Sequence, residues 1–410
     1  MSAEGAEPEG NNNNHGTTIE VRKLARLGAC TFGIANAFYL TLSSAPTHLW
    51  SMGGDTAAGA ATTISTVATA AASAVAPRMV AHLGRRAVFA IAALALGLPC
   101  FAVFGGNLMI AEAACAVRGA GLGLAFVAAG GLAATLAPPA RRGELLGLYG
   151  LAFSVPAIFA VSLGLWILAH LGPAALALAG TGCALMTLLG LGAFPKRAGQ
   201  TPALPLWRLP WRRLGWPVVV QTGGAAAIGM MITLFARADG SARVGATAVF
   251  AMFLHGVAAA FARWWGGRLG DRHGRRKLIA AGCALSAIAT LLLAAASTPA
   301  LLAIGAGSLG LAFGFQRNGT LTLMLARTSA AETDAVNAAW NIAYDAGLGM
   351  GALAYCCLAP VFGDLAAITT IALVIAGATF VGFLLFERMR HLSSGQPRSS
   401  RGGQSSAMAM

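Results

Sequence analysis

The sequence predicts an all-α membrane protein with twelve transmembrane helices, arranged as two six-helix bundles that are pseudo-repeats of each other. Three observations predict this fold class: an excess of apolar residues, twelve apolar windows of membrane-spanning length, and motifs that recur in both halves. Of the 410 residues, 57% are hydrophobic and 10% are charged, and the mean hydropathy is +0.70. Soluble domains average roughly 45–50% apolar and about 25% charged residues. The composition therefore excludes an ordinary soluble domain.

Each apolar window is about as long as the roughly 20 helical residues that cross a bilayer core of about 30 Å. None alternates between apolar and polar residues as the strands of a membrane β-barrel do. The first window is too long for a signal peptide and lacks a cleavage site of small residues, so we expect it to be a retained helix. The windows cover residues 25–45, 55–77, 87–105, 108–136, 144–169, 173–194, 215–236, 244–262, 277–297, 299–326, 335–359 and 362–386.

The basic residues predict the orientation of the spans. If the N-terminus is cytoplasmic, 24 of the 28 Lys and Arg residues fall on the cytoplasmic side. Arg237 and Arg243 fall outside, and Arg118 and Arg317 fall within spans. Lys and Arg accumulate in cytoplasmic loops of membrane proteins, so we expect both termini to be cytoplasmic, in a bacterial-type inner (plasma) membrane. The net charge of +14 then reflects topology, and no nucleic acid is expected as a partner.

The chain divides into two similar halves. LGLAF at residues 122–126 recurs at 309–313, and the loop at 77–89 is similar to that at 267–279. Parallel repeats around a site at the membrane midplane are a common plan of transporters. The expected organisation is a disordered tail (1–20), an N-terminal six-helix bundle (21–195), a cytoplasmic linker (196–213), a C-terminal six-helix bundle (214–388) and a second disordered tail (389–410).

Cofactor and catalytic motifs are not found in the sequence. All seven cysteines fall in apolar spans and none shows the spacing of metal ligands, so we expect them to pack as small apolar side chains. There is no nucleophile elbow, phosphate-binding loop or zinc motif. The sequence therefore predicts neither an enzyme nor an ATP-driven pump, and no metal or cofactor.

A family resemblance comes from the loop GRLGDRHGRR at residues 267–276. It resembles G-x-x-x-D-R-x-G-R-R, the signature loop of the major facilitator superfamily, and PPARRGELLGLYG (138–150) is similar to a segment of efflux members. The resemblance implies the fold of that family, in which spans 1, 4, 7 and 10 line a central cavity and the two halves rock to give alternating access. The gating loop that it implies contains Gly267, Asp271, Arg272, Gly274, Arg275 and Arg276.

The resemblance also implies a contact for Asp271. This acid is expected to dock at the inner start of span five, near Gly143 and Glu144, when the inner gate is shut; a solvated loop without that contact is the alternative. In the first-half loop Ala81 replaces the corresponding acid, so the contact is expected on one side only. The antiporter motif of span five is reduced to Gly164, which weakens a drug/proton antiporter assignment.

Ionisable side chains inside spans are functional candidates, because they are costly in the membrane. Glu112 lies near the outer end of span four and can also reach water there. Arg118 is deeper and, by resemblance, faces the cavity, where it would attract an anionic group or favour the ionised form of a nearby acid. For His255, in span eight, packing within the protein is the more frequent role.

Arg317 and Asp345 are expected to lie at the same depth. Each is 14 residues from Ala331, at the centre of the loop that joins spans ten and eleven. Asn341 precedes Asp345 on one helical face, and Gln316 stands beside Arg317 in a polar belt. Pairing offsets the cost of lone charges at this depth. The pair could be a static fastener, or Asp345 could exchange a proton as its distance from Arg317 changes.

These residues predict a secondary transporter that moves a small organic solute by alternating access, most simply by proton-coupled export of a drug or metabolite. The alternatives are a metabolite importer or facilitator, and a membrane sensor that has kept the fold without transport. The expected partners are the solute, protons and the lipid bilayer, and the expected state is a monomer.

Overall fold

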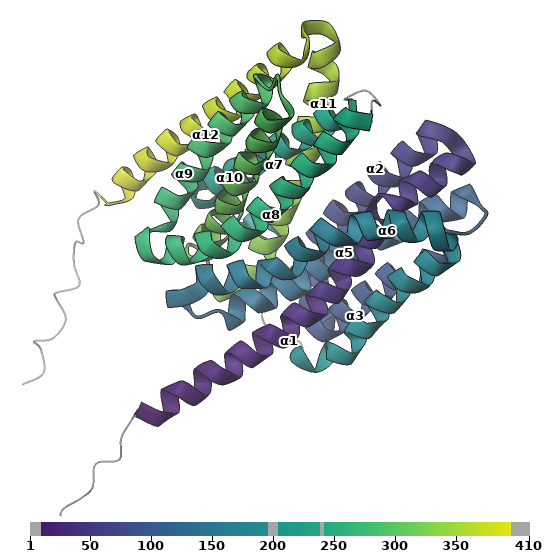
Figure 1. Cartoon of the computed structure of the whole chain (residues 1–410). Coiled ribbons are helices and arrows are strands. Elements are labelled where there is room, and N and C mark those ends of the chain that lie inside the picture. Colours follow the sequence, from purple (N-terminus) through teal and green to yellow (C-terminus); the bar gives the residue numbers. More distant parts are fainter. Residues whose placement is uncertain (1–9, 196–203, 238–241, 395–410) are drawn as a thin grey trace, which may run out of the picture.

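The computed structural model describes residues 10–195, 204–237 and 242–394, which form helices joined by short connections (Figure 1). The described residues contain no β-strand. The helices of the first half are α1 (Gly10–Leu42), α2 (Ser44–Leu83), α3 (Arg85–Gly97), α4 (Cys100–Val103), α5 (Leu108–Leu136) and α6 (Arg142–Met186). Those of the second half are α7 (Trp211–Arg237), α8 (Ala242–His273), α9 (Arg275–Ala294), α10 (Pro299–Leu325), α11 (Thr333–Phe362) and α12 (Asp364–Ser394).

Twelve membrane crossings account for these helices. Ten stretches of the described chain are long and apolar enough to cross a membrane. One of them, Pro139–Gly192, has 54 residues and contains a bend at Gly172, where φ is +83°. Pro173 follows this bend, and a proline inside a helix removes a backbone hydrogen bond and favours a break. This stretch therefore supplies spans five and six, and α1 supplies the first span.

Some boundaries differ from the sequence prediction. The structure continues α1 back to Gly10 and α12 forward to Ser394, so parts of both expected tails are helical. The connection before α7 begins in residues 196–203, outside the described residues, and α7 begins at Trp211 within the expected linker. Helix α8 extends to His273, although the sequence predicts that span eight ends at residue 262.

The repeated LGLAF motif brings helices together in the same way in each half. A Cβ atom on Gly123 of α5 would collide with the backbone oxygen of Thr69 on α2. A Cβ atom on Gly310 of α10 would collide with the backbone oxygen of His255 on α8. Small residues allow such close helix approach in membranes. The sequence repeat therefore corresponds to two equivalent helix crossings.

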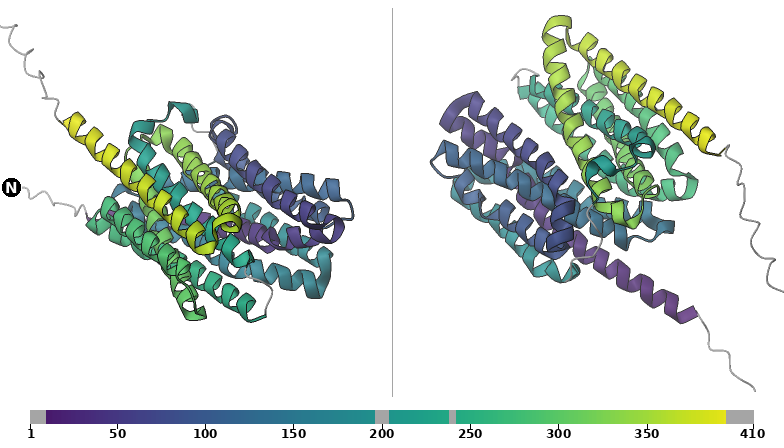
Figure 2. Two further views of the ribbon diagram at one scale, coloured as in Figure 1. Left: turned by 90° about the horizontal axis from the view of Figure 1, so that it is seen from above. Right: turned by 180° about the vertical axis from the view of Figure 1, so that it is seen from behind.

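The start of α1 and the end of α12 lie at the same end of the two bundles, which we call the terminal end (Figures 1 and 2). The apolar core that contains Leu27 and Leu132 of the first bundle also contains Met324 and Val336 of the second. These last two residues lie near the connection between α10 and α11, at the terminal end. Toward the opposite end, further core clusters of the described residues are confined to one bundle each. The bundles are thus packed together at the terminal end.

Candidate functional site

A small cavity of about 30 Å³ lies between the two bundles. It has room for a group of one or two water molecules in size. Helices α5 and α6 of the first bundle and α8, α10 and α11 of the second all contribute to its wall. The lining residues are Phe126, Gly130, Leu146, Tyr149, Phe153, Arg263, Arg317, Leu321, Asn337, Trp340 and Asn341. Because both bundles form it, any rocking of one against the other changes its shape.

Aromatic rings surround Arg317 in this cavity. Its guanidinium carbon lies 4.4 Å from the ring centre of Trp340, 4.3 Å from that of Tyr344 and 5.5 Å from that of Phe313. Cation–π contacts of this kind stabilise a desolvated guanidinium by about 2 kcal/mol or more. One terminal nitrogen, Nη1, is buried without a hydrogen-bond partner. The cation is therefore held in place and keeps one free donor.

Asp345 lies near Arg317 without touching it. The two charges interact electrostatically, but no salt bridge within 4.0 Å joins them among those that the described residues form. The Oδ2 atom of Asp345 is buried and has no hydrogen-bond partner. The expected ion pair is therefore not formed, because the rings of Trp340 and Tyr344 take the place of the carboxylate around the guanidinium.

Arg263 is the second cation of the cavity, and the sequence prediction missed it. The predicted span ends at residue 262 and leaves Arg263 in a cytoplasmic loop. In the structure it lies within α8, 9% exposed, with its side chain against Gly150 of α6. Trp264 and Trp265 continue the apolar pattern beyond it, and they are the signal that could have extended the span.

Asn337 connects α11 to the first bundle, and Asn341 lies one turn further along the same helix. Asn337 donates a hydrogen bond from Nδ2 to the backbone oxygen of Phe126, at 2.8 Å. Asn341 donates to the backbone oxygen of Asn337, at 2.9 Å. Asn337 also lies against Gly130, where a Cβ atom would come within 2.5 Å of its Nδ2. Asn341 lines the cavity and lies on the same helical face as Asp345.

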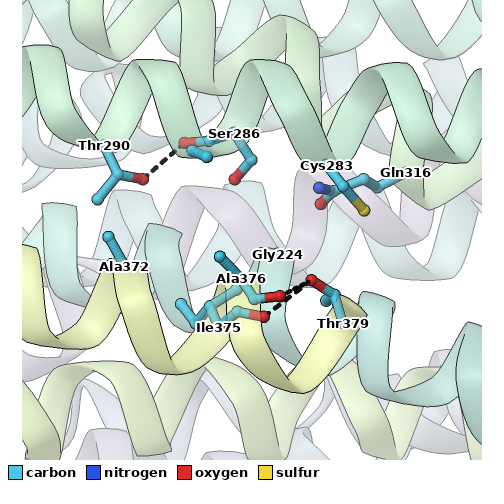
Figure 3. A pocket seen from close by; sticks show the side chains of 10 residues that line it. Gly224, Cys283, Ser286, Thr290, Gln316, Ala372, Ile375, Ala376 and Thr379 are labelled. Carbon is cyan, nitrogen blue, oxygen red and sulfur yellow. Dashed lines mark hydrogen bonds between the residues drawn. The ribbon is translucent and has the colours of Figure 1, made fainter. Parts of the chain in front are cut away.

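Gln316 does not face the central cavity. Its side chain lies inside the second bundle, in a separate cavity of about 20 Å³ that is also lined by Cys283, Ser286 and Thr379 (Figure 3). Its Oε1 atom is buried without a hydrogen-bond partner. Gln316 and Arg317 are adjacent on a helix, and adjacent helical residues point about 100° apart. The expected polar belt is therefore divided between two cavities.

Arg118 does not face the central cavity either. It is 4% exposed and donates within the first bundle to the backbone oxygen of Ala37 at 3.0 Å. It also donates to the backbone oxygen of Leu96, the Cys100 sulfur and the Thr41 hydroxyl. The guanidinium thus joins α1, α3 and α4 to α5, which corrects the expectation that it faces the cavity.

Glu112 and His255 lie away from this cavity. Glu112 is half-buried in the first turns of α5. His255 is buried, and its Nδ1 lies 3.2 Å from the backbone oxygen of Ala306 on α10. This contact fits the packing role expected of His255.

At the terminal end, Asp271 makes the contact that the family resemblance implies. Its two carboxylate oxygens accept hydrogen bonds from the backbone N–H groups of Gly143 at 3.1 Å and Glu144 at 2.9 Å. These groups belong to the first turn of α6, where a carboxylate is favoured by the helix dipole. Glu144 in turn accepts from Nε of Arg268 at 2.7 Å. Gly267 is required here because a Cβ atom would collide with the backbone of Gly143.

The other residues of the gating loop surround this contact. Arg275 lies 3.6 Å from Asp271, and Gly274 has φ +98°, where α8 gives way to α9. A positive φ is easily adopted only by glycine. Arg272 is exposed at the end of α8, and Arg276 follows Arg275 in the first turn of α9.

The first half has its own ionic contact, although Ala81 lacks a carboxylate. Nη1 of Arg85, at the start of α3, lies 2.6 Å from Oδ1 of Asp334 in the first turn of α11. The two side chains meet above Gly131 of α5, where a Cβ atom would collide with Asp334. The expectation of a one-sided contact is therefore wrong: an arginine after the break between α2 and α3 reaches across in place of the missing acid.

Comparison with known protein families agrees with this geometry. The sequence model of the Major Facilitator Superfamily matches residues 27–242 and 218–408. The chain belongs to the Major Facilitator Superfamily. Its membership agrees with the two helical bundles that pack around a central cavity.

Solved structures share the fold of this superfamily member at low sequence identity. The Escherichia coli fucose:proton symporter FucP is 17% identical with a TM-score of 0.72. The human organic anion transporter MFSD10 (TETRAN) is 16% identical with a TM-score of 0.69. FucP in the outward conformation is 16% identical with a TM-score of 0.71. Each alignment covers 90% of this chain and 99% of the other. No curated protein is significantly similar in sequence.

Replacing Arg118 in this superfamily member is expected to affect stability first. Arg118→Ala removes the hydrogen bonds from the guanidinium to the backbone oxygens of Ala37 and Leu96, and a hydrogen bond to a charged group contributes about 1.5–3 kcal/mol. Arg118→Lys should recover part of the loss, because lysine lacks the guanidinium fork. Thermal unfolding of the purified variants measures this. Unchanged unfolding together with lost solute binding would instead place Arg118 in the transport pathway.

Reversing the Arg85–Asp334 charges tests the contact in the first half. Arg85→Glu alone places two carboxylates together and should lower transport several-fold, because the closed terminal end is destabilised. Arg85→Glu with Asp334→Arg restores opposite charges and should recover a large part of the rate. Transport by proteoliposomes that contain each variant measures this. A double variant no better than the single one would show that the ion pair is not the reason for the loss.

Proposed function

We propose that the protein is a proton-coupled secondary transporter that moves a small organic solute by alternating access. The observation that carries this proposal is Asp345, a carboxylate with a buried, unpartnered oxygen beside Arg317. A carboxylate in a membrane span that has no fixed partner can take up and release a proton, because neither state is held by a hydrogen bond. Asp345 lies one helical turn after Asn341, which lines the cavity that both bundles enclose.

The arrangement of the bundles supports an outward-facing state. We place the terminal end in the cytoplasm of a bacterial-type plasma membrane, as the basic residues favour. The shared apolar core and the contacts of Asp271 and Asp334 then close the cytoplasmic side. A single chain supplies both walls of the cavity, so a monomer suffices for transport.

We propose export as the direction of solute movement, on the similarity of residues 138–150 to efflux members. Import is the second candidate, and the fold shared with FucP, solved as a fucose:proton symporter, favours it. In export and in import alike, the solute and the proton bind at the interface between the two bundles, and the bundles rock around this interface.

A growth and accumulation screen in cells that over-express the chain identifies a candidate solute. Flux of that labelled solute into proteoliposomes under an imposed pH gradient then tests the proposal. Uphill movement of the solute in the direction opposite to the protons supports export. Uphill movement of the solute in the same direction as the protons supports import. Solute flux that does not depend on the pH gradient contradicts proton coupling. The absence of flux for every solute of the screen supports a membrane sensor that has kept the fold without transport.

A further inference from the structure

We propose that the central cavity binds the anionic group of a small organic anion between Arg263 and Arg317. This inference rests on the proposed function and names the substrate class of the same site. It begins with the charges that face the cavity. Arg263 and Arg317 both line it, and they interact electrostatically with each other. Two cations side by side in a buried site repel, so this arrangement is costly unless negative charge compensates it.

The surrounding protein supplies less negative charge than is needed. The titratable groups that act on the two arginines are Asp345 and the phenols of Tyr39, Tyr149 and Tyr344. Asp345 is the only carboxylate among them, and it forms no salt bridge with Arg317. Neutral phenols leave one positive charge in excess when Asp345 is ionised. One anion would neutralise this excess.

Donors are available for that anion. Nη1 of Arg317 is buried without a hydrogen-bond partner. The Arg263 side chain is held by packing against Gly150 and lines the same cavity. Guanidinium groups bind carboxylates with short, charge-assisted hydrogen bonds, often in pairs. Two guanidinium groups from α8 and α10 can therefore hold one carboxylate.

The wall of the cavity indicates what accompanies the anionic group. Phe126, Leu146, Phe153 and Leu321 are apolar and lie beside the arginines. The cavity of about 30 Å³ has room for a carboxylate group but not for the rest of a larger organic anion. The rest of the organic anion would lie along the interface between the bundles, which widens as the bundles rock. These features favour an organic acid over a fully hydrated inorganic ion.

Ligand-induced thermal stabilisation of the purified protein in detergent tests the inference without transport, because a ligand that binds only the folded state raises its stability with concentration. The probes are acetate and benzoate. Their neutral controls are acetamide and benzamide, the cationic control is benzamidine, and the inorganic anion for comparison is chloride. We expect acetate or benzoate to bind at least tenfold more tightly than acetamide or benzamide. Equal binding of acid and amide, equal binding of chloride, or no binding of either acid would overturn the inference.

Variants locate the binding site. Arg317→Gln and Arg263→Gln should each weaken benzoate binding at least tenfold, and Arg263→Lys should weaken it less than Arg263→Gln. Arg212→Gln removes an exposed arginine at the start of α7 and should leave binding unchanged. Benzoate binding that is unaffected by either glutamine variant would overturn the inference.

Asp345→Asn distinguishes this inference from the proposed function. Removing the carboxylate removes repulsion of the anion, so benzoate should bind several-fold more tightly, although proton-coupled transport is lost. A role of Arg317 in packing alone would not produce this gain. Weaker binding in Asp345→Asn would overturn the inference. Anion binding without any proton-coupled flux would contradict the proposed function alone, and proton-coupled flux of a neutral solute without anion binding would contradict this inference alone.

Discussion

Asp345→Asn is expected to abolish uphill transport under a pH gradient, with at least a tenfold loss of accumulation. The amide cannot exchange a proton, so the driving gradient no longer acts on the solute. Because asparagine resembles the protonated carboxylate in size and charge, exchange of solute across the membrane should persist and should no longer depend on pH. Accumulation and exchange in the same proteoliposomes measure both parts of this prediction.

Glu112→Gln is the matched control for Asp345→Asn, since it replaces the other carboxylate of the membrane spans singled out from the sequence. Glu112 lies near the start of α5 and does not line the central cavity, so its replacement should leave accumulation near that of the wild type. Normal accumulation by Asp345→Asn with loss in Glu112→Gln would move the coupling role to Glu112. The double variant Arg317→Asp with Asp345→Arg should be inactive in transport. A purely structural ion pair would tolerate this charge swap, but the two residues form no salt bridge.

Asp271→Asn is expected to lower the transport rate about tenfold by destabilising the closed terminal end. The carboxylate accepts from two backbone N–H groups in the first turn of α6, and the neutral amide offers one acceptor oxygen and no charge. A contact of this kind is worth up to about 2 kcal/mol in partly buried geometry. A change of one or two kcal/mol alters the ratio of two states by a factor of 5–30.

Spin labels at Ala140 and His273, exposed residues of the two bundles at this end, report the change directly in a background without the native cysteines. Asp271→Asn should shift the distance distribution between the labels toward longer distances. Glu332→Gln is the control, because it changes a carboxylate to an amide at the same end, within a capping box in which glutamine is also favourable. The same distance distribution in Asp271→Asn and in the wild type would show that the contact does not hold the bundles together.

The sequence alone determined the number of spans and the division into two similar halves, and the resemblance of one loop to a known family predicted the contact of Asp271 with α6. Each depends on short-range information: a run of apolar residues of sufficient length, or a motif of ten residues whose partner the family resemblance supplies. LGLAF also predicted equivalent halves, and Gly123 and Gly310 do occupy equivalent helix crossings.

Only the tertiary structure decided which side chains face the cavity. The inward face of a soluble helix can be read from its stripe of apolar residues. The spans of this protein are apolar on every side, because lipid and the protein interior are similarly apolar. Hydropathy therefore could not distinguish Arg317, which faces the cavity, from Arg118, which binds carbonyl groups inside the first bundle. It also excluded Arg263 from the membrane, because a charge ends an apolar window even where a cavity between two bundles accommodates it.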